Sequence, residues 1–179
     1  MHKINPLLFG VTFLTSFLSN LTIGLNIQQP SPSAIAQTNN PKMQPLEVMD
    51  ENTKFTLLAP QGAKVMKGSW GNIKIQAGNK FEIELSISDE SIFNRNSVAE
   101  LKKEVRANDV NVLKRVLIET PTSILYESNV ISTSPEFHLY VYKELDKTRL
   151  ICENRKSQIF SQSEAELMWK SCNSVAKKS

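Results

Sequence analysis

Residues 81–88 alternate between apolar and polar side chains without a break, and no other segment constrains the fold as strongly. The apolar set is Phe81, Ile83, Leu85 and Ile87, and the polar set is Glu82, Glu84, Ser86 and Ser88. Because successive side chains of a strand point to opposite faces, the segment is predicted to be a strand with one buried face. Another layer of structure must then cover that apolar face.

Further strands are predicted from short apolar or alternating runs that end at turn-forming residues. They cover residues 55–59, 73–77, 112–119, 122–128, 136–143 and 148–155, and residues 63–67 are expected to extend the first of them. Short turns at residues 77–80 and 145–147 join neighbouring strands, so two antiparallel hairpins are expected.

Two helices are predicted from capping boxes, in which a Ser and a Glu three residues later satisfy each other's backbone N–H groups. The boxes are Ser97–Glu100 and Ser161–Glu164. Each box precedes an apolar stripe at helical spacing. The stripes are Val98, Leu101 and Val105 in the first helix, and Ala165, Met168, Trp169, Cys172 and Val175 in the second. The second helix is expected to end at Lys177 and Lys178, whose charges suit the negative end of its dipole.

The resulting order is strands, helix, strands, helix. Hairpins outnumber any possible βαβ unit, so the predicted fold class is α+β, with a mainly antiparallel β-sheet covered by helices.

This chain resembles the PsbP-like α/β/α sandwich superfamily, which includes PsbP-, DcrB- and LpqN-type exported proteins. The resemblance covers roughly residues 54–176 and is carried by the two hairpins and three segments: FTLLAPQGAKV (55–65), SVAELKKEV (97–105) and FSQSEAELMWKSCNSV (160–175). The family often has an aromatic residue soon after the first Pro-Gly turn, where this chain has Ala63. The resemblance implies an exported, mostly non-enzymatic accessory role, such as a lumenal photosystem assembly or extrinsic protein, and it carries over no site residues.

The N-terminus has the pattern of a secretory signal peptide. Lys3 precedes an uncharged apolar run over residues 7–27, and Ala34-Ile35-Ala36 supplies the small residues that signal peptidase requires. Cleavage is expected after Ala36, although the run is also about long enough to remain as a membrane anchor. We therefore expect a signal peptide at residues 1–36, a flexible polar lead-in at 37–53 and one α+β domain at 54–179, with docking of residues 46–49 on the domain as the alternative for part of the lead-in. Export could be to the periplasm, the thylakoid lumen or the extracellular space.

Cys152 and Cys172 are the two cysteines of the chain, 20 positions apart. An even number of cysteines in an exported protein favours a disulfide, with two buried free thiols as the alternative. Their spacing matches neither a zinc site nor a C-x-x-C redox motif, so no metal is expected.

The charge balance excludes one class of partner. The chain has 21 Lys and Arg against 18 Asp and Glu, a formal net charge of +3, which is not the strongly basic footprint of a nucleic-acid-binding protein. A modest basic cluster remains at Lys102, Lys103 and Arg106, with Lys114 and Arg115 nearby. It is either a solvated helix face or a docking surface for an anionic membrane or an acidic protein.

Three candidates for binding or chemistry remain. Trp70 lies between glycines in Gly68-Ser-Trp-Gly-Asn72, where the backbone can present the ring to a partner or let it cap the core. His138 shares a sheet face with Tyr140 and Tyr142, which is either a binding stripe or a face packed under a helix.

Glu82 and Glu84 also share one face of a strand. Paired carboxylates of this kind could act in a glycosidase, but the polar face of a half-buried strand is normally solvated. No phosphate-binding glycine motif is present, and no cofactor is expected.

These observations predict an exported, non-enzymatic accessory or binding protein. Its partner is an unidentified protein or small ligand, and a peripheral position on a membrane complex is one form of this prediction. The alternatives are a small secreted hydrolase and a periplasmic protein tethered by an uncleaved N-terminal anchor.

Overall fold

The computed structural model describes residues 41–50, 53–68, 71–88, 97–130, 134–146 and 148–178. All of them belong to one compact unit, Asn39–Ser179. The predicted signal peptide, its cleavage after Ala36 and the alternative membrane anchor lie outside the described residues. Neither helix in the described part of the chain is long and apolar enough to span a bilayer.

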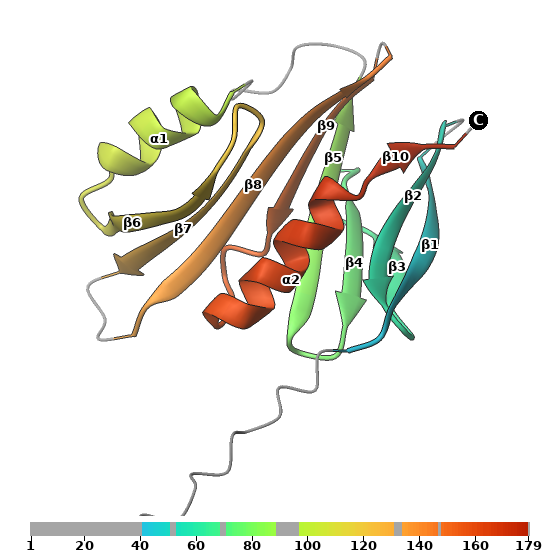
Figure 1. Cartoon of the computed structure of the whole chain (residues 1–179), viewed down its shortest axis with the longest axis horizontal. Helices are drawn as coiled ribbons and strands as arrows, with labels where there is room; N and C mark the ends of the chain where they lie inside the picture. Colours follow the sequence, from blue (N-terminus) through green and yellow to red (C-terminus); the bar gives the residue numbers. More distant parts are fainter. Residues whose placement is uncertain are drawn as a thin grey trace, which may run out of the picture. The chain divides into compact units, whose positions relative to one another are not determined.

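A seven-stranded, fully antiparallel sheet forms the centre of the unit, in the order β3-β4-β5-β9-β8-β7-β6 (Figure 1). Its strands are β3 (Lys64–Lys67), β4 (Ile73–Ala77), β5 (Phe81–Ser88), β6 (Asn111–Glu119), β7 (Ser123–Val130), β8 (Glu136–Leu145) and β9 (Thr148–Asn154). The β4–β5 and β8–β9 hairpins are both present. The α+β class with a mainly antiparallel sheet is therefore confirmed.

The two helices cover opposite faces of this sheet. Helix α2 (Gln162–Asn173) packs with a large apolar cluster that includes Ile83 and Leu85 of β5 and Leu139 of β8. Helix α1 (Val98–Arg106) packs on the other face, where Tyr140 of β8 joins a smaller cluster. Because alternate residues of β8 enter different clusters, the central strands are buried on both sides.

A second sheet of three strands, in the order β1-β2-β10, lies on the same side of the larger sheet as α2. Its apolar residues belong to the same core cluster as those of α2. Its strands are β1 (Met43–Asp50), β2 (Thr53–Pro60) and β10 (Ala176–Lys177). Ser171 Oγ of α2 donates to the Leu58 carbonyl, and Ser174 Oγ accepts from the Leu58 N–H at 2.8 Å. These bonds fix the C-terminal end of the helix to β2.

Two sequence predictions about this region are wrong. Residues 37–53 were expected to be a flexible lead-in, but Met43–Asp50 is a strand whose Val48 lies opposite Phe55 of β2. Pro45 argues against a strand, yet β1 is an edge strand, where a residue without an N–H is tolerated. Residues 63–67 do not extend β2, because Lys64–Lys67 pairs with β4 in the larger sheet.

Both predicted helix starts are confirmed. Ser97 Oγ accepts from the Glu100 N–H at 3.2 Å, and Ser161 and Glu164 form the complete capping box. The predicted end of α2 is wrong, because the helix stops at Asn173.

Lys143 of β8 takes the role expected of the C-terminal lysines. Its ammonium group donates to the carbonyl oxygens of Asn173 and Val175, the latter at 2.8 Å. A cation from the sheet therefore complements the negative end of the α2 dipole.

The predicted disulfide between Cys152 and Cys172 is confirmed. Cys152 lies on β9 and Cys172 on α2, both fully buried, with their Cα atoms 5.6 Å apart. The bond ties α2 to the middle of the seven-stranded sheet, and a disulfide is compatible with an oxidising exported compartment.

Candidate functional site

A groove of about 660 Å³ runs between α1 and the turn that joins β6 to β7. The Ser97 cap directs Val98 and Leu101 of α1 toward the sheet, which leaves the basic residues of the helix along its sides. The apolar lining residues are Val98, Ala99, Ala107 and Pro121, and the polar ones are Lys102, Lys103, Arg106, Glu119 and Thr120. We call this feature the α1 groove.

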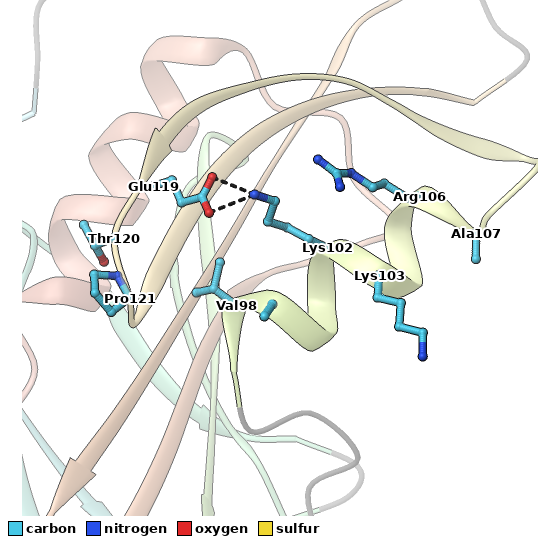
Figure 2. A pocket seen from close by; sticks show the side chains of 9 residues that line it. Val98, Lys102, Lys103, Arg106, Ala107, Glu119, Thr120 and Pro121 are labelled. Carbon is cyan, nitrogen blue, oxygen red and sulfur yellow. Dashed lines mark hydrogen bonds and ion pairs between the residues drawn. The ribbon is translucent and has the colours of Figure 1, made fainter.

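One ion pair closes the sheet side of the α1 groove. The Lys102 ammonium lies 2.8 and 2.9 Å from the two carboxylate oxygens of Glu119. Figure 2 shows Lys102 and Arg106 reaching toward the same space, whereas Lys103 extends in another direction. Neither Lys103 nor Arg106 makes an ion pair with any residue that the structure describes. Two cations without an ion-pair partner among the described residues therefore remain, Arg106 toward the interior of the groove and Lys103 at its edge.

The turn that forms the far wall of the groove is held by its own side chains. Thr120 Oγ1 accepts from the backbone N–H groups of Thr122 at 3.3 Å and Ser123 at 2.9 Å. It also lies 2.8 Å from the hydroxyl of Ser123, a fully buried residue. Glu119 and Pro121 are thereby presented on a fixed loop, as a binding surface requires.

The basic cluster of the sequence does not converge as a whole. Lys114 and Arg115 lie on β6, where the register with β7 shifts between Leu113 and Arg115. Arg115 pairs with Glu127 at 2.5 Å. Neither Lys114 nor Arg115 lines the α1 groove.

Sequence reasoning found the α1 cations but missed Glu119, Thr120 and Pro121. The available signal was Pro121, which lies between the strands predicted at residues 112–119 and 122–128 and so indicates a turn.

His138 lies on the α1 face of β8 beside Tyr126, with ring centroids 5.3 Å apart. It is 6% exposed, and burial, together with the nearby Lys156 charge, lowers its pKa to about 4. The Glu136 carboxylate is 3.6 Å from Nε2, which is too long for a hydrogen bond. Desolvation therefore outweighs this attraction, and the imidazole is neutral at pH 7.

Tyr140 and Tyr142 share the α1 face of β8 with His138, as the alternation predicts. Tyr140 is fully buried in the small cluster under α1. Tyr142 lies at the margin of this cluster, and its hydroxyl donates to the Glu144 carboxylate at 2.6 Å. The pKa of the Tyr142 phenol is raised, mainly by burial and secondly by this hydrogen bond. The stripe is thus placed largely under a helix, and its part in binding stays a prediction.

The two strand carboxylates have different surroundings. Glu82 is only 1% exposed, against the expectation of a solvated polar face, and its Oε1 lies 2.8 Å from the Lys74 ammonium. Arg155 approaches the same oxygen at 3.4 Å. Glu84 accepts a hydrogen bond from the Asn72 amide at 3.0 Å. The cations beside Glu82 come from β4 (Lys74) and from the residue that follows β9 (Arg155), which sequence alternation along β5 cannot reveal.

Trp70 lies outside the described residues, so its role as a binding anchor stays a prediction. Among the side chains that the structure does describe, no three His, Cys, Asp or Glu residues gather as a metal site would require.

No protein-family model matches this chain, and no curated protein matches it either.

Proposed function

We propose that this chain is an exported, non-enzymatic accessory protein whose domain docks through the α1 groove onto an acidic segment of a protein partner. The observation that carries the proposal is the position of Lys103 and Arg106, two cations without an ion-pair partner in the described chain, beside a concave surface with apolar walls. Charge complementarity around an apolar patch is a common arrangement at protein–protein interfaces.

The charge distribution favours an acidic protein over an anionic membrane. Peripheral membrane binding through charge normally uses a cluster of roughly four to eight Lys and Arg residues. Here Glu119 lies in the groove and pairs with Lys102, while Lys103 and Arg106 remain. A flat lipid surface would meet mixed charge, whereas a protruding acidic segment can enter the concave surface to reach Arg106 and contact Lys103 at its edge.

The alternative of a small hydrolase has less support from the residues that would carry it. Neither His138 nor Glu82 lines the α1 groove. The His138 ring is buried with a pKa near 4, and the Glu82 carboxylate is held by Lys74 and Arg155. A general base needs access to its substrate and a pKa near the working pH, so these groups fit structural roles better.

Export is supported by two independent features. The N-terminal sequence has the pattern of a signal peptide. The Cys152–Cys172 bond is the kind of crosslink that persists in oxidising compartments. The packing of α1 on one face of the sheet and α2 on the other is also what a PsbP-like α/β/α sandwich would have, and that family's extrinsic accessory role accords with the proposal.

Capture from the native organism tests this function. A full chain with a C-terminal tag is purified after mild crosslinking, and its N-terminal residue and intact mass are read in the same run. We expect a defined protein complex and a chain that begins at Gln37. A chain that retains residues 1–36 would identify a tethered protein instead, and a cleaved chain without any partner would contradict the docking function.

A further inference from the structure

We propose a second binding site, for a small organic anion, in a cavity on the α1 face of the sheet above β4 and β5. This cavity, of about 520 Å³, is distinct from the α1 groove, and the two share no lining residue. Its size falls within the range of ordinary small-molecule sites. Its charged lining residues are Lys67, Lys74, Glu84 and Arg155.

Two of the cations that line this cavity, Lys74 and Arg155, form ion pairs with a buried carboxylate that does not itself line the cavity. Glu82 is 1% exposed and lies 2.8 Å from Lys74 Nζ and 3.4 Å from an Nη atom of Arg155. A charge this deeply buried costs several kcal/mol unless well-placed partners compensate it. Since both of its cations line the cavity, Glu82 fixes their side chains where a ligand would meet them.

Arg155 keeps hydrogen-bonding capacity for a ligand. Its Nε donates to Ser157 Oγ at 2.7 Å, and one Nη group faces Glu82. A guanidinium has more N–H donors than these two contacts use, and its planar fork suits carboxylate and phosphate oxygens. The side chain is 45% exposed, so these donors are accessible.

The net charge of the cavity also favours an anion. Lys67, Lys74 and Arg155 supply three positive charges, while Glu82 behind the wall and Glu84 on it supply two negative ones. Lys67 makes no ion pair among the described residues. One positive charge therefore remains uncompensated, and it lies beside the open volume.

The polar groups around these cations define the rest of the ligand. Glu84, held by the Asn72 amide, and the nearby Gln76 side chain can hydrogen-bond to hydroxyl groups. The site therefore suits a small hydroxylated molecule that carries a carboxylate or phosphate group. The anionic group would lie at Lys67 and Arg155, and the hydroxyls toward Glu84.

Calorimetric titration of the full chain tests this site, with glucuronate and glucose 6-phosphate as probes and glucose as the neutral control. We expect saturable binding of at least one anionic probe and none of glucose, and the probe that binds identifies the group. Arg155→Gln should weaken binding at least ~tenfold, the loss of one charge-assisted interaction. The matched control Arg115→Gln, which removes a paired arginine on β6, should bind as the wild type does.

Three results would overturn the proposal: no binding of either anionic probe, equal binding of glucose, or unchanged binding by Arg155→Gln. The melting temperature of each variant is measured alongside. If Arg155 serves only to neutralise Glu82, its loss lowers the melting temperature and the wild-type chain binds no probe.

Discussion

Cys152 of β9 and Cys172 of α2 are joined by a disulfide that closes a loop of 20 positions, with the two Cα atoms 5.6 Å apart. Both cysteines belong to the larger apolar core, and the bond fixes α2, a helix that contacts strands of both sheets.

Reducing this bond should destabilise the domain by about 3 kcal/mol, because the unfolded chain regains the conformational freedom that a closed loop of this length removes. Urea unfolding with and without a reductant measures the difference. The double variant Cys152→Ala/Cys172→Ala is the control, since its unfolding midpoint should not respond to the reductant. A wild-type midpoint that is also insensitive would show that the crosslink contributes little.

Acidification should destabilise the domain through His138. Its folded pKa of about 4 lies below the unfolded value of roughly 6.5, so the unfolded state binds more protons between these values. The stability that its neutral form provides is complete above pH 6.5 and is lost progressively as the pH falls toward 4. Between pH 7 and pH 5 the loss should be about 2 kcal/mol.

Urea unfolding of the wild type and of His138→Gln at both pH values isolates this contribution, because the variant should lack that part of the pH dependence. An NMR titration provides a second check, and the variant distinguishes the signal of His138 from that of His2. An imidazole signal of His138 that titrates near pH 6.5 would contradict the buried, neutral assignment.

Lys143→Met should destabilise the domain by about 1–2 kcal/mol. The substitution removes the ammonium group that bonds the carbonyls of Asn173 and Val175 at the end of α2. Lys170→Met removes a lysine from the last turn of the same helix, but that residue is exposed, so only a few tenths of a kcal/mol should be lost. Equal effects of the two substitutions on urea unfolding would argue against a specific cap by Lys143.

Gly68→Ala should cost about 1 kcal/mol by displacing a side chain. An added Cβ would collide with the Asn72 amide oxygen, and the amide must rotate away from Glu84 to relieve the contact. In an Asn72→Ala background, Gly68→Ala should cost little, because the obstacle is gone. A double-mutant cycle of unfolding free energies measures this coupling, and additive effects would disprove it.

The sequence was sufficient for the elements that carry local signals. The alternation over residues 81–88 predicted β5, and the Ser97 and Ser161 signals predicted the starts of α1 and α2. The position of Cys172 on the apolar stripe of the second helix predicted that its side chain faces the sheet, where it bonds Cys152. Each of these signals depends on neighbours within a few positions of the chain, which is why it can be read in advance.

Features that depend on distant partners were missed. β1 and β10 are strands because both pair with β2, and Lys177 lies opposite Phe55 across more than a hundred positions of sequence. Glu82 of β5 is buried beside Lys74 of β4 and Arg155, which follows β9. Arg155 is more than seventy positions away in the sequence, so this contact has no local signal. The α1 groove likewise combines α1 with the turn between β6 and β7. The sequence showed the cations of the helix, but it did not show that this turn lies beside them.

Docking through the α1 groove is tested most directly by repeating the crosslinked capture with a charge variant. Lys103→Gln/Arg106→Gln removes the two groove cations that have no ion pair in the described structure, and leaves Lys102 on Glu119. The matched control is Lys80→Gln/Lys170→Gln, which removes two exposed lysines from the β4–β5 turn and α2. We expect the groove variant to keep its melting temperature but to bind the captured partner at least ~tenfold more weakly, while the control binds normally. Equal capture by the groove variant and the wild type would contradict the assignment of this groove as the docking surface.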